Sequence, residues 1–96
     1  MPASEFRVFV TARFERDYRS LGRGHPELAE RYAAALAVLK RDPYNRTRRY
    51  PIKKLEGIAA GHGQYRLRSG RFRFRYDIQG QLVFLKACSL RREDTY

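Results

Sequence analysis

The chain has 96 residues, with 21 lysines and arginines against 10 acidic residues, a net charge of +11 and a pI near 10.5. This length predicts one domain over residues 1–96. No apolar run reaches the ~18 residues of a membrane span, no signal-peptide pattern is present, and the single cysteine excludes an internal disulfide and a cysteine-based metal site. We therefore expect a cytoplasmic protein that uses no metal and no cofactor and does not contact a membrane.

The first third of the chain predicts a strand and two helices. Apolar residues at positions 6, 8 and 10 alternate with their neighbours, which indicates a strand over about residues 5–11. Thr11 is suited to cap a helix that glycines at positions 22 and 24 end. A second helix begins near Pro26, has an apolar stripe at helical spacing, and stops at Asp42-Pro43.

Positive charge is concentrated in the middle third of the chain. Residues 43–76 carry 10 basic side chains and one acidic one, a net charge of +9, and such a local excess favours a polyanionic partner. Residues 43–63 form a long connection, or a short irregular strand, that is rich in proline and glycine. The basic residues of this connection that we expect to contact RNA are Arg46, Arg48, Arg49, Lys53 and Lys54.

The most informative segment is residues 64–76, where arginines alternate with apolar residues on both sides of Ser69-Gly70. This alternation predicts a hairpin with Ser69-Gly70 as its turn, one apolar face and one arginine face. Like charges directly opposite across strands destabilise a sheet, so arginines retained on one face indicate an anionic ligand. In this register the opposed pairs are Arg68 with Arg71 and Arg66 with Arg73. The arginines expected on this face are Arg66, Arg68, Arg71, Arg73 and Arg75.

The last part of the chain predicts a turn at Gly80 and a final strand. The run from Leu82 to Cys88 is nearly continuously apolar, as in a central strand covered on both faces, and it places Cys88 in the core. The expected fold is α+β, in the order β-α-α-β-β-β. A small, mostly antiparallel sheet carries two helices on its apolar face and leaves the arginine face free.

Common catalytic motifs are few in this sequence. No carboxylate pair, nucleophile motif or P-loop occurs; His25 is expected at the surface and His62 in a loop. Arginine forks bind phosphate, and tyrosines beside basic residues can stack on unpaired bases, which favours single-stranded RNA as the ligand. Tyr44 and Tyr50 are candidates for such stacking, or they pack beneath the loop that contains them.

The segments K-K-L-E-G and Y-R-L-R-S-G-R-F-R-F-R-Y-D-I, followed by an apolar strand and R-R-E-D-T-Y, resemble the RelE/ParE superfamily of type II toxins. The resemblance covers nearly the whole chain. RelE-like members cleave mRNA in the ribosomal A site, and ParE-like members inhibit DNA gyrase. Both are neutralised by an antitoxin, which is expected to be acidic and partly disordered.

The resemblance also implies roles for individual residues. In RelE-like cleavage the RNA 2′-OH attacks the adjacent phosphate; here Arg73 and Arg91 would hold that phosphate, and Tyr96 would stack on a base or assist proton transfer. Leu90 stands where many ribonuclease members have a histidine, which favours gyrase inhibition. A non-enzymatic nucleic-acid or antitoxin-binding module is the third alternative. The residues that correspond to the family's catalytic set are Arg66, Arg73, Arg91 and Tyr96.

Overall fold

The computed structural model describes residues 5–91 and has the predicted α+β architecture. Between the second helix and the arginine hairpin the chain forms one further short strand, so the connection at residues 43–63 is partly extended. The elements are β1 (Arg7–Val10), α1 (Ala12–Gly22), α2 (Leu28–Arg41), β2 (Ile52–Lys54), β3 (Tyr65–Ser69), β4 (Phe72–Gln79) and β5 (Leu82–Leu90).

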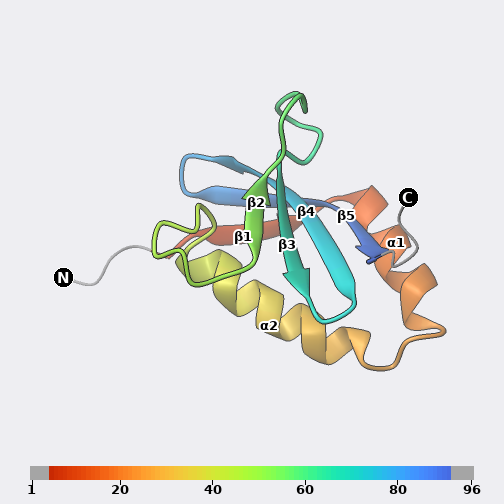
Figure 1. The fold of residues 1–96 in the computed structure, drawn as a ribbon. Coiled ribbons are helices and arrows are strands. Elements are labelled where there is room, and N and C mark those ends of the chain that lie inside the picture. The colour runs from red at the N-terminus through yellow and green to blue at the C-terminus, as the bar shows by residue number, and fades with distance from the viewer. Residues whose placement is uncertain (1–4, 92–96) are drawn as a thin grey trace.

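The five strands form one sheet in the order β1-β5-β4-β3-β2 (Figure 1). The pairs β5–β4, β4–β3 and β3–β2 are antiparallel, and only β1 and β5 run parallel. The two helices carry the chain from β1 to the far edge of the sheet, and the meander then returns it to lie beside β1. The expectation of a mostly antiparallel sheet is therefore confirmed.

Both helices pack on the same face of the sheet. Helix α1 lies against β5, and α2 lies against β3, β1 and β4. Alternate residues of the strands point toward the helices, where Phe72, Phe74 and Tyr76 meet Phe14 of α1 and Leu39 of α2. These five side chains are at most 2% exposed, so the core occupies this side of the sheet, and neither α1 nor α2 covers the opposite side. We call that opposite side the outer face.

Local hydrogen bonds fix the start of α1 and the chain that directly follows α2. The Thr11 hydroxyl accepts from the Phe14 N–H at 3.2 Å, which confirms the predicted cap. Beyond α2, the Asp42 carboxylate accepts from the Arg46 N–H at 2.8 Å and from the Thr47 N–H at 3.0 Å. Burial would raise the pKa of Asp42, but the hydrogen bonds from Thr47 and Arg46 outweigh it and lower the pKa overall. Asp42 therefore ties the start of the connection to the end of the helix.

The predicted turn of the arginine hairpin is wrong by one residue. Ser69 pairs with Phe72, so the turn residues are Gly70 and Arg71. A two-residue turn with glycine first needs a positive φ at that position, and Gly70 has a φ of 63°. The Ser69 hydroxyl also donates to the Arg31 carbonyl at 3.0 Å, which holds the turn against α2. Each cross-strand partner moves by two residues, so the division into two faces is unchanged.

Strand β5 is internal to the sheet, as predicted, but it is not covered on both faces. Val83, Leu85 and Cys88 are buried under the helices, whereas Phe84, Lys86 and Ala87 on the outer face are only half-buried. The prediction of two covered faces is wrong because both helices lie on one side. Outer-face residues of β5 gain cover only from neighbouring side chains and loops.

Cys88 is a core residue, as predicted, and its thiol should be inert. The side chain is buried, and burial, followed by the negative charge of Asp17, raises the pKa of the thiol to about 12. The reactive thiolate is therefore scarce at neutral pH. We expect iodoacetamide at pH 8 to label the native protein far more slowly than the guanidinium-unfolded protein, as measured by mass spectrometry. Equal labelling rates in the two states would contradict this burial.

Candidate nucleic-acid interface

Four arginines of the hairpin lie together on the outer face. In β3 and β4, Arg66 pairs with Arg75 and Arg68 with Arg73. Lys53 of β2 pairs with Arg66 and extends the first row of charges. Directly opposed side chains lie about 5 Å apart at their Cβ atoms, so the cationic groups are crowded. We call this set the arginine face; its residues are Lys53, Arg66, Arg68, Arg73 and Arg75.

No residue of the arginine face forms an ion pair within residues 5–91. The ion pairs there join Arg13 to Asp17 and Arg71 to Glu27, and neither includes a residue of this face. The Nε atoms of Arg66 and Arg73 are inaccessible to water and have no hydrogen-bond acceptor in the described structure. A buried donor without an acceptor costs about 1–3 kcal/mol. An anionic ligand would supply the opposite charge, and it would accept from these Nε atoms only after the arginine side chains moved to expose them.

Arg66 lies in the field of several positively charged neighbours. Partial burial lowers its pKa, and neighbouring positive charges lower it further. Those charges belong to Arg73, Arg68, Arg75 and Arg91, in order of decreasing effect. Arg91 follows β5, and its N–H donates to the Arg71 carbonyl at 2.6 Å. The structure thus brings Arg91 into the field of the arginine face, while Tyr96 lies outside the described residues.

Two residues predicted beside these arginines lie elsewhere. Arg71 was expected on the arginine face, but it occupies the turn, where its guanidinium is 3.7 Å from the Glu27 carboxylate. Lys54 pairs with Tyr65 and therefore faces the helices, with its Nζ 5.7 Å from the centroid of the Tyr65 ring. Since side chains alternate along a strand, Lys53 and Lys54 cannot both face the same ligand.

The basic residues of the connection between α2 and β2 form a separate group. Arg46 lies over the Tyr44 ring, with its guanidinium carbon 4.6 Å from the ring centroid, and Arg48 and Arg49 are exposed. Tyr44 itself packs edge-on against Phe6 and Tyr65 and is 36% exposed. Of the two alternatives for Tyr44, stacking on a base or packing against its own protein, these contacts favour packing.

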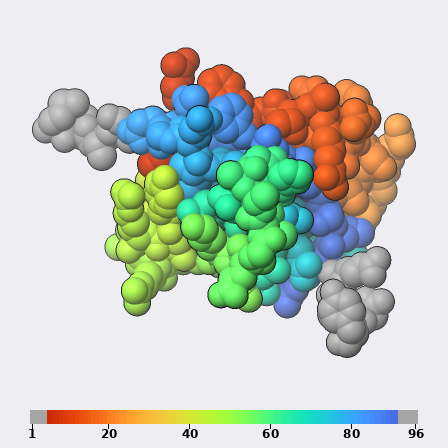
Figure 2. All heavy atoms as spheres, turned by 90° about the horizontal axis from the view of Figure 1, so that it is seen from above, coloured from red at the N-terminus to blue at the C-terminus, as the bar shows by residue number. Residues whose placement is uncertain are grey.

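Arg75 holds a loop as well as adding charge. Its guanidinium donates to the His62 carbonyl at 2.9 Å and to the Gly63 carbonyl at 2.9 and 3.1 Å. Gly63 has a φ of 82°, and a Cβ there would lie 3.1 Å from the Cβ of Arg75, so glycine suits this close approach. The loop, residues 55–64, stands at the front of the molecule in Figure 2, in green. Arg75 thus fixes the loop beside the arginine face.

Asp77, which the sequence analysis did not identify, holds the same loop by accepting hydrogen bonds from its backbone. Its two carboxylate oxygens each accept a hydrogen bond of 2.9 Å, one from the Gly63 N–H and one from the Gln64 N–H. In the sequence, the only indication of this role is that Asp77 lies two residues after Arg75, on the strand pair that follows the Gly61-His62-Gly63 segment. The carboxylate is 7% exposed and satisfied, so it orders the loop rather than neutralising the arginines.

Removing the Asp77 carboxylate should destabilise the protein. Asp77→Ala leaves two backbone N–H groups of the loop without their acceptors, and we expect the free energy of unfolding to fall by about 2–3 kcal/mol. Urea unfolding followed by circular dichroism measures this loss. Gln79→Ala, at an exposed position of the same strand, is the matched control and should change stability little. An equal effect of the two substitutions would show that the loop is not held this way.

The two histidines differ in their environments. His25 was expected at the surface, but it is half-buried: its ring packs edge-on against Phe72, and its Nδ1 is 3.0 Å from the Leu21 carbonyl. His62 is an exposed loop residue, as predicted, and adjoins Arg75. Leu90 pairs with Phe72 and packs against the core, so it points away from the outer face.

No protein-family model, curated protein or solved structure matches the chain. Within residues 5–91 there is no group of three or more histidine, cysteine, aspartate or glutamate side chains arranged to hold a metal ion. In the same residues no helix is long and apolar enough to cross a membrane.

Proposed function

We propose that the chain is the toxin of a type II toxin–antitoxin system and cleaves mRNA on the ribosome in the cytoplasm. The observation that carries the proposal is the arginine face, where paired arginines lie without described carboxylate partners and two Nε atoms lack acceptors. A phosphodiester backbone supplies the opposite charge, and its oxygens accept from the fork of guanidinium N–H groups in the geometry that arginine prefers. The partners of this function are the mRNA, the ribosome and an acidic, partly disordered antitoxin.

The proposed chemistry needs no metal. The 2′-OH of the RNA loses its proton and attacks the adjacent phosphate, the bond to the 5′-oxygen of the next nucleotide breaks, that oxygen takes up a proton, and a 2′,3′-cyclic phosphate remains. Arg73 and Arg91 stabilise the negative charge that develops on the phosphate, and Arg66 neutralises it from the same side. Arginine does not accept a proton at neutral pH, so the ribosome must position the 2′-OH for attack and supply much of the rate enhancement.

Inhibition of DNA gyrase is the second candidate. It is favoured by Leu90, whose side chain packs against the core at the position where ribonuclease relatives have a histidine. A binding module without catalytic activity would also use the arginine face, but it would leave both mRNA and DNA supercoiling unchanged.

Primer extension on translated mRNA tests the proposal directly. The protein is expressed under an inducible promoter, and mRNA extracted from the arrested cells is mapped for new 5′ ends within coding sequence. We expect cleavage only in translated messages, with the same message intact when its start codon is removed. Growth arrest with intact mRNA and reduced plasmid supercoiling would instead identify gyrase as the target.

A further inference from the structure

A β-bulge directs Lys86 to the outer face. Arg75 pairs with Ala87 and Tyr76 pairs with Leu85, so Lys86 has no partner between them. Bulges of this kind re-aim a side chain and are common beside functional sites. The Nζ of Lys86 lies 5.9 Å from the centroid of the Phe84 ring, and the side chain lines two neighbouring cavities.

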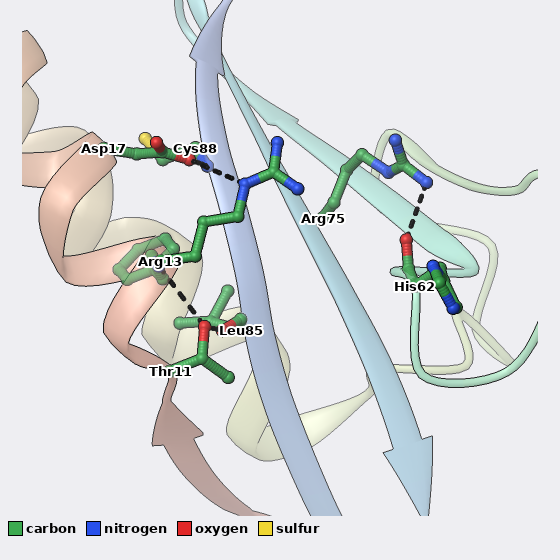
Figure 3. Close-up of polar contacts among 8 residues, drawn as sticks. Thr11, Arg13, Asp17, His62, Arg75, Leu85 and Cys88 are labelled. Atoms are coloured by element: carbon green, nitrogen blue, oxygen red, sulfur yellow. Dashed lines mark hydrogen bonds and ion pairs between the residues drawn. The ribbon is translucent and has the colours of Figure 1, made fainter.

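The first cavity is cationic. It has a volume of about 260 Å³, and its lining includes Arg13, His62, Arg75 and Lys86. Figure 3 shows Arg13 extending from α1 across β5, while Arg75 extends from β4 to the loop at His62. Two carboxylates lie nearby: that of Asp17 is 3.9 Å from Arg13 and accepts from the Cys88 N–H, and that of Asp77 accepts from the Gly63 and Gln64 N–H groups and lines the neighbouring cavity. Three positive side chains from three separate elements thus converge on a space large enough for a phosphate group.

The second cavity, on the other side of Lys86, is more apolar. It has a volume of about 460 Å³ and is lined by Phe84, Ile78, Gln64 and Gln79, among others. The Phe84 ring stacks on Phe9, with ring centroids 5.7 Å apart and planes at 24°, and Phe9 is 43% exposed. An aromatic surface with amide groups at its edge is suited to a nucleobase, which stacks on a ring and forms hydrogen bonds at its rim.

We propose that these two cavities form one nucleotide subsite, separate from the centre of the arginine face. The phosphate lies among Arg13, Arg75 and Lys86, and the base lies against Phe84, with the Gln64 and Gln79 side chains at its edge. Lys86 and Gly61 line both cavities, so the two spaces adjoin one another. Because Arg75 also belongs to the arginine face, a single RNA strand would run from that face into the subsite. The RNA identity of the natural ligand rests on the proposed function.

Binding of a labelled RNA hexamer to the full chain tests the subsite. The probe is fluorescein-labelled hexauridylate, and its affinity is measured by fluorescence anisotropy at several salt concentrations. Lys86→Gln should weaken binding about fivefold or more and reduce the slope of log affinity against log salt by about 0.7, the value for one phosphate contact on a single strand. Phe84→Leu should weaken binding about fivefold or more, because a stacked base is lost, but leave the salt slope unchanged.

A matched control separates the subsite from general charge effects. Lys40→Gln removes the same charge from an exposed position at the end of α2 and should leave affinity and slope near the wild-type values. Thermal unfolding of each variant shows whether it is folded. Wild-type affinity in both Phe84→Leu and Lys86→Gln, or equal losses in Lys86→Gln and Lys40→Gln, would overturn the proposal. So would binding of a polyglutamate peptide that is as tight as that of the hexamer and insensitive to Phe84→Leu.

The subsite and the proposed function can fail separately. Cleavage of translated mRNA by the wild type, with hexamer binding unaffected by Phe84→Leu and Lys86→Gln, would retain the ribonuclease and reject the subsite. Loss of hexamer binding in both variants, with no mRNA cleavage by the wild type, would retain the subsite and reject the ribonuclease.

Discussion

Replacing Arg73 or Arg91 with alanine should abolish growth arrest and lower the rate of mRNA cleavage by about 10²–10³-fold, the typical effect of removing one group that stabilises transition-state charge. The stability of the folded protein should not decrease. The Nε of Arg73 is buried without a described acceptor, and Arg68 lies directly opposite. Arg73→Ala removes this repulsion, so its melting temperature should equal or exceed that of the wild type by up to a few degrees.

The control for these variants is Arg16→Ala, an exposed position of α1. Arg31 is unsuitable as a control, because its side chain lies against the hairpin turn: a Cβ at Gly70 would be 2.6 Å from the Arg31 Nε. Cleavage is followed by primer extension and stability by thermal unfolding. Wild-type cleavage by Arg73→Ala would remove Arg73 from the site. A lower melting temperature would instead show that Arg73 has a structural role.

The free protein should become more stable when its positive charges are screened or bound. Added salt weakens the repulsion within the arginine face, because exposed charges more than ~10 Å apart are largely screened at 0.1 M ionic strength and the closer, half-buried ones are screened in part. Single-stranded RNA and the antitoxin should stabilise more strongly. A partner present at a thousand times its dissociation constant adds about 4 kcal/mol, or roughly 20 °C in melting temperature for a chain of this size.

Differential scanning fluorimetry at increasing sodium chloride, with and without hexauridylate or antitoxin, measures these shifts. The double variant Arg68→Gln/Arg73→Gln lacks one opposed pair of charges and should show a smaller response to salt and RNA than the wild type. A melting temperature that does not change with salt, RNA or antitoxin would contradict the proposal that the arginine face binds an anionic partner.

The two faces of the hairpin were predictable because they follow from local alternation. A side chain points to one face or the other according to its position along the strand, so arginines at 66, 68, 73 and 75 share the outer face in either register. The turn was not predicted correctly, since Ser69-Gly70 and Gly70-Arg71 both preserve that alternation. The contact between Ser69 and α2 selects the second of these, and this contact joins residues 38 positions apart.

By itself, the sequence determined the α+β class, the cap of the first helix, the buried cysteine and the concentration of positive charge, because each depends on composition or on short-range periodicity. Only the tertiary structure decided which charges act together. The parallel pairing of β1 with β5 brings Arg13 of α1 beside Lys86, and the clamp formed by Arg75 and Asp77 sets His62 next to both. These contacts join distant segments. Their geometry depends on how helices and strands pack around the core, which no local pattern of residues specifies.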